Sequence, residues 1–429
     1  MPHASVADHL HRALAALAPG ALVVGYSGGA DSSVLLHALA HNAAARARGL
    51  RAVHIDHGLH EDSAAWSEHC RAAAAGFGIP LDVVRVEVER DRGTGLEDAA
   101  RSARTAAFER LLRPGEILTL AHHRDDQAET VLLKLLRGAG PEGLGGMREL
   151  RTFAQGHLWR PLLDLPRSVL LDYARRHDLH WLDDPSNTDT TLRRNFLRND
   201  ILPRLETRWP GADIALAHSA AWARNAADFI DAEAHKALAR LQGLDPATLV
   251  WRDWLALPDA LRDPVLRLWL RDLNLDEPAH FHVAELERQL READDDRLPC
   301  VSFAQTELRR YRDLVYALCP LPALPDHWQA AWNGDAAFPL PAGGTLALSP
   351  PRRLDSPLSV RYRQGGERIK PAGSAHTRDL RLLFQETGVP PWLRDRIPLI
   401  FLDGELIAVG DLFVSDAGAA LGGRFVLGE

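Results

Sequence analysis

The chain has 429 residues, enough for two or three domains of roughly 150 residues each, and its 46% hydrophobic and 25% charged residues are the ordinary mix of a soluble globular protein. Its net charge of −8 excludes a uniformly basic nucleic-acid coat, so an anionic partner must be met by local patches. The three scattered cysteines, Cys70, Cys300 and Cys319, form no CxxC pair; this excludes a disulfide framework, a zinc ribbon and a cysteine-held iron–sulfur cluster, and predicts a reducing, cytoplasmic compartment.

Residues 13–30, near the start of the chain, carry no charge, as a membrane span would. Pro19-Gly20 and Ser27-Gly28-Gly29 interrupt this stretch, so the pattern favours a helix, a turn, a strand and a loop. No basic start is followed by an apolar run, so neither a membrane segment nor a secretory signal is predicted.

Short apolar runs alternate with helical patterns up to about residue 137. We expect strands at 21–26, 51–56, 81–86 and 116–121, followed in turn by helices at 32–45, 63–77, 96–112 and 125–137. This alternation is typical of an α/β domain with a doubly wound parallel sheet. Ligands of such sheets bind at the carboxyl ends of the strands.

The pattern changes twice further along the chain. Residues 210–318 look helical without strand-like alternation, which predicts an all-helical domain with a core built on Trp222, Trp251, Trp254 and Trp269. A linker at 320–325 precedes a tail with strand-like runs and one helix at 377–385, which predicts a small α+β domain. The expected domains are 1–208, 209–325 and 338–429.

A glycine-containing loop joins the first expected strand to the first expected helix and reads Ser27-Gly28-Gly29-Ala30-Asp31-Ser32. Glycines let the backbone approach an anion, and the helix amino terminus can then hold a phosphate. The loop is not a mononucleotide P-loop, because none of the three lysines of the chain follows a glycine. The alternative is a tight strand–helix turn that binds nothing.

Residues 121–130, which read Ala-His-His-Arg-Asp-Asp-Gln-Ala-Glu-Thr, follow the fourth expected strand and should face the same crevice. Acidic residues beside a triphosphate make sense if Mg²⁺ bridges them to it, and a histidine there can stabilise charge or move a proton. The alternative is a helix start whose acids only interact with the helix dipole.

A second histidine-rich run, residues 54–60, follows the second expected strand and could be written as a metal site with His54, Asp56, His57 and His60. His54 and Asp56 share one face of the strand, whereas His57 lies beyond its end. The pattern therefore favours a loop near an adenine, with His57 as an ATP-binding residue, over a metal site.

These motifs together resemble the tRNA(Ile)-lysidine synthetase family, within the PP-loop ATP pyrophosphatase superfamily. The Ser27–Ser32 string resembles the pyrophosphate loop of that superfamily. The family resemblance is carried by residues 121–147, Ala100-Arg101-Ser102-Ala103-Arg104, Asp184-Pro185-Ser186-Asn187, Arg194-Asn195-Phe196-Leu197-Arg198, Ile201-Leu202-Pro203, and the tail segments 366–371, 383–385 and 389–392. It spans nearly the whole chain and is strongest before residue 205 and after residue 360.

The resemblance implies an ATP-dependent ligase that acts on the wobble cytidine of the CAU anticodon of tRNA(Ile). The cytidine is adenylated and then joined to free L-lysine, which gives lysidine and changes the codon read from AUG to AUA and the amino acid from methionine to isoleucine. The implied cofactors are ATP and Mg²⁺, no membrane partner is implied, and a homodimer is left open. The residues that bind lysine are not predicted.

The resemblance also assigns roles to individual residues. The implied catalytic residues are Asp31, Arg104, His123 and Asp126; the implied ATP-binding residues are Ser27, Gly28, Gly29, Ala30, Asp31, Ser32 and His57; and the implied Mg²⁺ ligands are Asp31 and Asp126. Thr105 departs from the family, which usually has an aromatic residue there, and the expected consequence is limited to packing.

Two arginine-rich stretches, residues 193–208 and 361–381, suit contacts with RNA phosphates. The expected tRNA-binding residues are Arg194, Arg198, Arg368, Lys370, Arg378 and Arg381. The resemblance assigns the tail domain to the acceptor stem of the tRNA. A solvated charged face is the alternative for any one of these residues. The rival functions are a tRNA thiolase, which the missing cysteine pairs disfavour, and a non-catalytic RNA-binding protein that keeps ATP as a ligand.

Overall fold

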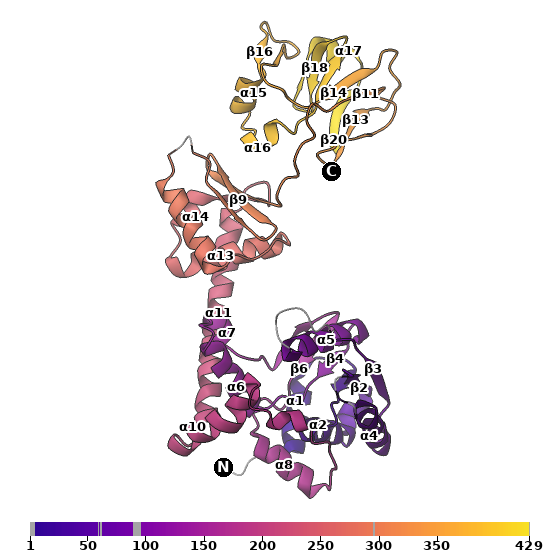
Figure 1. The fold of residues 1–429 in the computed structure, drawn as a ribbon, viewed down its shortest axis with the longest axis vertical. Helices are drawn as coiled ribbons and strands as arrows, with labels where there is room; N and C mark the ends of the chain where they lie inside the picture. Colours follow the sequence, from indigo (N-terminus) through magenta and orange to yellow (C-terminus); the bar gives the residue numbers. More distant parts are fainter. Residues whose placement is uncertain (1–4, 59, 61, 89–95, 295–296, 429) are drawn as a thin grey trace. The chain divides into compact units, whose positions relative to one another are not determined.

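The computed structural model describes residues 5–58, 60, 62–88, 96–294 and 297–428 (Figure 1). The chain divides into two compact units, an N-terminal unit, Met1–Ala232, and a C-terminal unit, Glu233–Glu429. Among the described residues, no helix is both long and apolar enough to cross a membrane.

A six-stranded sheet with the order β3-β2-β1-β4-β6-β5 forms the centre of the N-terminal unit (Figure 1). Its strands are β1 (Leu22–Gly25), β2 (Leu50–Asp56), β3 (Leu81–Arg85), β4 (Ile117–Thr119), β5 (Leu150–Phe153) and β6 (Gly156–Trp159). The first four strands and β6 are parallel, and β5 pairs antiparallel with β6. The four strands expected from the sequence are confirmed, and the β5–β6 hairpin extends the sheet beyond them.

The strands of this sheet bury side chains on both faces. Leu22 and Val24 belong to one hydrophobic cluster, and Val23, which points to the other face, belongs to another together with Val53 and Phe108. Because both faces are covered, the sheet is doubly wound, as the alternating pattern predicts. The helices of the unit are α1 (Val6–Ala16), α2 (Ala30–Ala40), α3 (Ala43–Ala47), α4 (Ser63–Gly76), α5 (Leu96–Leu111), α6 (Arg124–Leu135), α7 (Pro141–Leu144), α8 (Arg167–Arg176), η1 (Pro185–Thr188), α9 (Arg193–Phe196), the π-helical turn η2 (Leu197–Ile201) and α10 (Leu202–Arg208).

A 30-residue helix, α11 (Ala212–Leu241), runs from the first unit into the second. Two predictions about the following segment need correction. Trp222 on α11 does not pack in a core, because 76% of its surface is exposed, whereas Trp251, Trp254 and Trp269 are buried as expected. The segment expected to be all-helical also contains a four-stranded antiparallel sheet with the order β7-β10-β9-β8.

The longest strand of this second sheet, β9, escaped the sequence pattern because its inward positions are partly polar. The buried positions of β9 are Thr306, Leu308 and Arg310, and the Arg310 guanidinium lies 4.7 Å from the centre of the Trp251 ring. An arginine facing the core breaks the apolar alternation by which a strand is recognised. The elements here are β7 (Thr248–Val250), α12 (Trp251–Leu255), α13 (Asp259–Asp272), α14 (His280–Glu292), β8 (Cys300–Phe303), β9 (Thr306–Tyr311) and β10 (Leu314–Leu318).

The tail is rich in strands and contains short helices, as an α+β domain should. A five-stranded sheet has the order β11-β14-β17-β18-β19, and a three-stranded sheet has the order β12-β13-β20. The helix expected at 377–385 is present as α15 (Leu380–Glu386). The other elements are β11 (Gln329–Trp332), β12 (Phe338–Pro339), β13 (Thr345–Ser349), β14 (Leu358–Arg361), β15 (Arg368–Ile369), β16 (Arg378–Asp379), α16 (Pro391–Arg394), β17 (Leu399–Leu402), β18 (Glu405–Val409), β19 (Phe413–Val414), α17 (Asp416–Ala420) and β20 (Arg424–Gly428).

Candidate active site

The loop Ser27–Ser32 connects the end of β1 to the start of α2. The Ser32 hydroxyl donates to the Gly29 carbonyl oxygen at 3.0 Å and lies 3.0 Å from the Ser27 hydroxyl, which fixes the turn. No side chain caps the amino terminus of α2, whose cap residue is Gly29. The loop therefore leaves backbone N–H groups of the first helical turn available to an anion, as a phosphate-binding loop requires.

Gly28 is a position in this loop that only glycine can occupy without strain. Its φ is +82°, in the left-handed region. A Cβ atom at this position would lie 2.8 Å from Sγ of Cys70 and 3.0 Å from Cδ1 of Leu182. The Gly28 carbonyl also accepts a hydrogen bond from the Leu182 amide at 2.9 Å, so the chain after α8 closes over the loop.

His123 precedes α6 and lies at the centre of three carboxylates. Its Nε2 atom is 3.6 Å from Oδ2 of Asp31 and 3.4 Å from Oδ2 of Asp126, and its Nδ1 atom is 3.6 Å from Oδ2 of Asp125. The Asp126 carboxylate accepts a hydrogen bond from the His123 amide at 3.1 Å, which ties the start of α6 to its cap. His123 thus joins the phosphate-type loop after β1 to the acidic segment after β4.

The charges around His123 set its protonation state. Burial, which leaves 1% of the side chain exposed, opposes a charged imidazole, but the nearby carboxylates of Asp125, Asp126 and Asp31 raise the pKa of His123 to about 10. Burial likewise opposes ionisation of Asp125, yet His123 and the Arg167 amide lower the pKa of Asp125 to about 2. At neutral pH the site therefore holds an imidazolium among carboxylates.

A second set of ion pairs fixes Asp126 from the other side. Glu129, whose side chain is fully buried, accepts from Nε of Arg194 at 2.7 Å and from Nε of Arg198 at 2.6 Å. Arg198 also donates to Oδ1 of Asp126 at 2.8 Å. Burial would raise the pKa of Asp126, but the charges of His123 and of the two arginines lower it.

Glu129 was missed by the sequence reasoning. The signal was its spacing, because Asp126 and Glu129 are three residues apart on one helix and share a face. Arg194 and Arg198, which we expected at a tRNA-binding surface, lie half-buried in this cluster with both carboxylates. Their role toward tRNA remains a prediction.

Arg104, on α5, takes part in no hydrogen bond or ion pair within the described part of the chain. Burial and the charges of Arg101 and Arg194 lower its pKa. Burial and the nearby charge of Arg104 also lower the pKa of His57, whose Nδ1 atom is buried without a hydrogen-bond partner. A half-buried cation beside an unsatisfied histidine nitrogen is suited to an anionic group of a ligand.

The second histidine-rich run does not assemble into a metal site. His54 is buried and its Nδ1 atom lies 2.9 Å from the Tyr26 carbonyl oxygen, which accounts for its position in the core. Among the described residues, no group of three or more His, Cys, Asp or Glu side chains has the geometry to hold a metal ion. Two carboxylates with a substrate phosphate would suffice for Mg²⁺, and Oδ1 of Asp31 is a buried oxygen without a hydrogen-bond partner.

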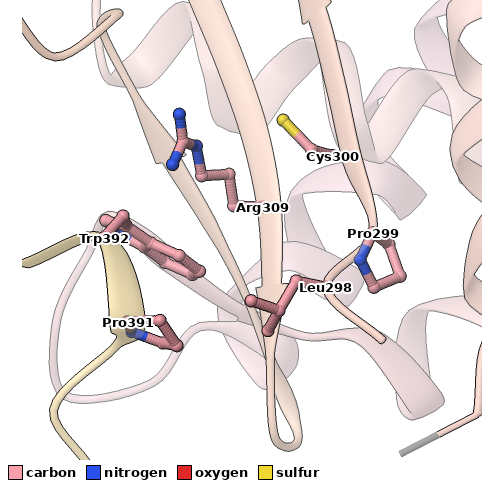
Figure 2. A pocket seen from close by; sticks show the side chains of 6 residues that line it. All are labelled: Leu298, Pro299, Cys300, Arg309, Pro391 and Trp392. Atoms are coloured by element: carbon pink, nitrogen blue, oxygen red, sulfur yellow. The ribbon is translucent and has the colours of Figure 1, made fainter. Parts of the chain in front are cut away.

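The remaining predicted residues lie in the C-terminal unit. Arg368, Lys370 and Arg381 are exposed and join none of the ion pairs found in the described part of the tail, whereas Arg378 pairs with Glu386 at 2.5 Å. A pocket of about 420 Å³ in the same unit is lined by Leu298, Pro299, Cys300, Arg309, Pro391 and Trp392 (Figure 2). No residue expected at the active site lines this pocket.

Comparisons with protein families match three segments of the chain. Residues 2–205 match the PP-loop domain, residues 250–316 the TilS substrate binding domain, and residues 358–425 the TilS substrate C-terminal domain. Among solved structures, the U34-tRNA thiolase NcsA from Methanococcus maripaludis matches with 20% identity and a TM-score of 0.37, over 46% of this chain and 70% of that one. This last likeness is too distant to inform the site.

Curated relatives match over nearly the whole chain. The chain is 46% identical over 399 residues to a tRNA(Ile)-lysidine synthase of Xanthomonas campestris, with 92% of each chain covered. It is 44% identical to that of Xylella fastidiosa, over 92% of this chain and 91% of the relative, and 42% identical to that of Pseudomonas aeruginosa, over 94% and 92%. With relatives this similar along its length, the chain belongs to the tRNA(Ile)-lysidine synthase family.

Proposed function

We propose that this protein uses ATP to join free L-lysine to the wobble cytidine of the CAU anticodon of tRNA(Ile), forming lysidine. The observation that carries the proposal is the contact of Asp31, in the loop Ser27–Ser32, with His123, which also contacts Asp126. The curated relatives of the chain are named tRNA(Ile)-lysidine synthase. The product changes the codon that the tRNA reads from AUG to AUA.

The reaction needs two steps because the carbonyl oxygen of cytosine is a poor leaving group. In the first step this oxygen attacks the α-phosphorus of ATP, and pyrophosphate leaves. In the second step the neutral amine of lysine attacks the ring carbon that bears this oxygen. AMP then leaves and takes the oxygen with it. Holding both reactants in line contributes much of the rate, up to roughly 7–11 kcal/mol in well-oriented systems.

The described residues provide groups for these steps. The uncapped start of α2 and the two serine hydroxyls of the loop are suited to bind the phosphates of ATP. The imidazolium of His123 and the half-buried guanidinium of Arg104 are suited to stabilise negative charge as it develops. His57, beside Arg104, would contact the same nucleotide.

Mg²⁺ is part of this proposal. Asp31 and Asp126 would hold it, since their carboxylates flank one nitrogen of His123 and Oδ1 of Asp31 has no hydrogen-bond partner. When bound, the ion would neutralise charge on the phosphates. Elemental analysis that finds stoichiometric zinc instead would contradict this assignment and favour a site at residues 54–60.

We also propose a division of labour along the chain. Residues 1–208 form the ATP-binding catalytic domain, residues 209–325 a substrate-binding domain, and residues 338–429 a tRNA-binding domain. The exposed cations Arg368, Lys370 and Arg381 support the last assignment, since arginine and lysine side chains contact RNA phosphates. The absence of cysteine pairs is consistent with action in the cytoplasm.

The test is a reaction with purified protein, ATP, Mg²⁺, lysine and a tRNA(Ile) transcript. We expect AMP and pyrophosphate to form together with lysidine, and tRNA(Met) with the same anticodon to be inert. Transfer of sulfur to the tRNA would establish the thiolase alternative, and binding of ATP and tRNA without turnover would establish the non-catalytic one. Sedimentation of the active species measures whether it is a monomer or a homodimer.

A further inference from the structure

Arg167, the first residue of α8, faces Asp31 across the phosphate-type loop. Its Nε atom lies 3.5 Å from Oδ1 of Asp31. Both atoms are buried, and neither has a hydrogen-bond partner. About 40% of the Arg167 side chain remains exposed, so part of the guanidinium reaches solvent. A cation and an anion thus lie next to each other without satisfying each other's hydrogen-bonding capacity.

Backbone contacts fix the position from which this arginine extends. The Arg167 amide donates to the Asp125 carboxylate at 2.9 Å, and the Arg124 amide donates to the Leu165 carbonyl at 2.9 Å. The buried side chains of α8, among them Leu170 and Tyr173, belong to the same hydrophobic cluster as those of α2. The start of α8 is therefore held against the starts of both α6 and α2, the two helices that carry the site.

The loop Ser27–Ser32 lacks a cationic side chain of its own, and Arg167 can supply one. The loop Ser27–Ser32 contains hydroxyl and amide donors but no lysine or arginine, and Asp31 adds a negative charge to it. Asp126 adds a carboxylate beside the same nitrogen of His123 as Asp31, and Asp125 adds one beside the other nitrogen. His123 and Arg198 offset part of this negative charge at Asp126. Arg167 is a further cation, in contact with the loop's own aspartate, where a polyphosphate would bind.

We propose that Arg167 binds the β- and γ-phosphates of ATP and retains the pyrophosphate that they become. In the adenylation step the cytosine oxygen forms a bond to the α-phosphorus. The bond from that phosphorus to the bridging oxygen breaks, and its electron pair leaves with pyrophosphate. The planar guanidinium presents several N–H donors to this leaving group. The reaction named here rests on the proposed function, whereas pyrophosphate binding at this loop can be measured without it.

The test is titration calorimetry of the full-length protein with pyrophosphate, and separately with AMP, in buffer containing Mg²⁺. The variants are Arg167→Gln, Arg167→Lys and, as a matched control, Arg176→Gln in the last turn of the same helix. We expect Arg167→Gln to weaken pyrophosphate binding about tenfold or more, the usual range for a lost charge-assisted hydrogen bond. AMP affinity should change less than twofold, Arg167→Lys should recover part of the loss, and the control should match the parent protein.

Two results would overturn the inference. One is unchanged pyrophosphate affinity in Arg167→Gln, whatever happens to its unfolding temperature, since Arg167 would then serve only to pair with Asp31. The other is an equal loss of pyrophosphate and AMP affinity, which would indicate general damage to the site; if Arg167→Gln does not fold, the same comparison with Arg167→Lys decides. Absence of lysine-dependent turnover in the parent protein, with this binding pattern intact, would contradict the proposed function alone.

Discussion

His123 connects two loops that are about ninety residues apart in the sequence, and its contacts predict that a single substitution there or at Asp31 affects the whole site. The first loop contributes the carboxylate of Asp31 and the second those of Asp125 and Asp126, and the imidazolium between them offsets their mutual repulsion. Removing one member changes both the local charge and the position of its neighbours.

Asp31→Asn and His123→Asn should each lower the rate of AMP formation by roughly 10²-fold or more, the size expected when a group that stabilises developing charge is lost. Single-turnover assays with saturating ATP and tRNA measure the rate. Asp172→Asn, a change of the same chemistry at an exposed carboxylate on α8, is the control. A near-normal rate in either variant, with circular dichroism unchanged, would contradict the site assignment.

The pKa of His123 also predicts how stability depends on pH. The ordinary value is 6.5 and the folded value is about 10, so between these values the folded protein keeps a proton that the unfolded chain has lost. The contribution of His123 is therefore complete below pH 6.5 and disappears as the pH rises toward 10, by at most about 1.4 kcal/mol per pH unit. Urea unfolding of the parent protein and His123→Asn across this range should give curves that converge at alkaline pH; parallel curves would refute the prediction.

The elements show which features a sequence pattern can reveal. Strands β1 to β4 were found from apolar runs because both faces of the sheet are buried. Strand β9 of the second sheet was not found, because Arg310 occupies an inward position and its apolar stem packs beside Trp251. Strands β8 and β10 do alternate, with Val301 and Phe303 or Val315 and Ala317 inward, but each is only four or five residues long. Trp222 was assigned to a core on residue type alone, and residue type does not reveal which face of a long helix is covered.

The same limit applies to the candidate site. The meeting of the Ser27–Ser32 loop with residues 121–130 could be predicted, because the carboxyl ends of adjacent parallel strands converge. The choice of Asp31, His123 and Asp126 within these segments came from the family resemblance, and their roles stay predictions. Glu129 and Arg167 could not be predicted, since their roles depend on contacts between α6 and the segments that begin at residues 167 and 193. Arg194 and Arg198 looked like surface cations, because the buried carboxylates that they meet lie more than sixty residues earlier.

Glu129→Gln on α6 tests how much the ion pairs of Glu129 with Arg194 and Arg198 contribute to the free energy of unfolding. The variant leaves two half-buried guanidinium groups without their shared carboxylate, and breaking a buried ion pair costs about 3 kcal/mol or more. We expect the free energy of unfolding to fall by about that amount, as measured by urea unfolding. Glu68→Gln, which removes an exposed carboxylate on α4, should change it by less than about 0.5 kcal/mol. An equally small change in Glu129→Gln would mean that the cluster is relaxed by solvent.

At the scale of the whole molecule, the two units differ in whether their cationic side chains are paired with carboxylates. The N-terminal unit holds Arg194 and Arg198 in ion pairs with buried carboxylates, and the tail presents exposed cations. This difference predicts that substitutions in the tail change tRNA affinity, and that they leave the adenylation step intact once tRNA is saturating.

The triple variant Arg368→Gln, Lys370→Gln and Arg381→Gln should weaken tRNA binding and flatten its dependence on salt. Each lost phosphate contact lowers the slope of log affinity against log salt by roughly 0.7–0.9, so three contacts lower it by about 2 to 3. Filter binding at several salt concentrations measures the slope. A control variant with the same loss of charge, Arg12→Gln, Arg71→Gln and Arg176→Gln, should keep the parent slope. Equal slopes in the two triple variants would show that the tail cations are only a solvated face.

Gly28 and Gly29, the adjacent glycines of the phosphate-type loop, should differ in which substitutions they tolerate. A Cβ atom at position 28 would overlap Sγ of Cys70, whereas at position 29 it would lie no closer than 3.5 Å to any neighbour, in an ordinary backbone conformation. In a library randomised at both codons and selected only for a folded protein, position 28 should return glycine almost alone, and position 29 should return alanine and serine as well. Selection for lysidine formation should then reduce the set of residues recovered at position 29. The difference between the two selections separates the residues that folding excludes from those that ligand binding excludes.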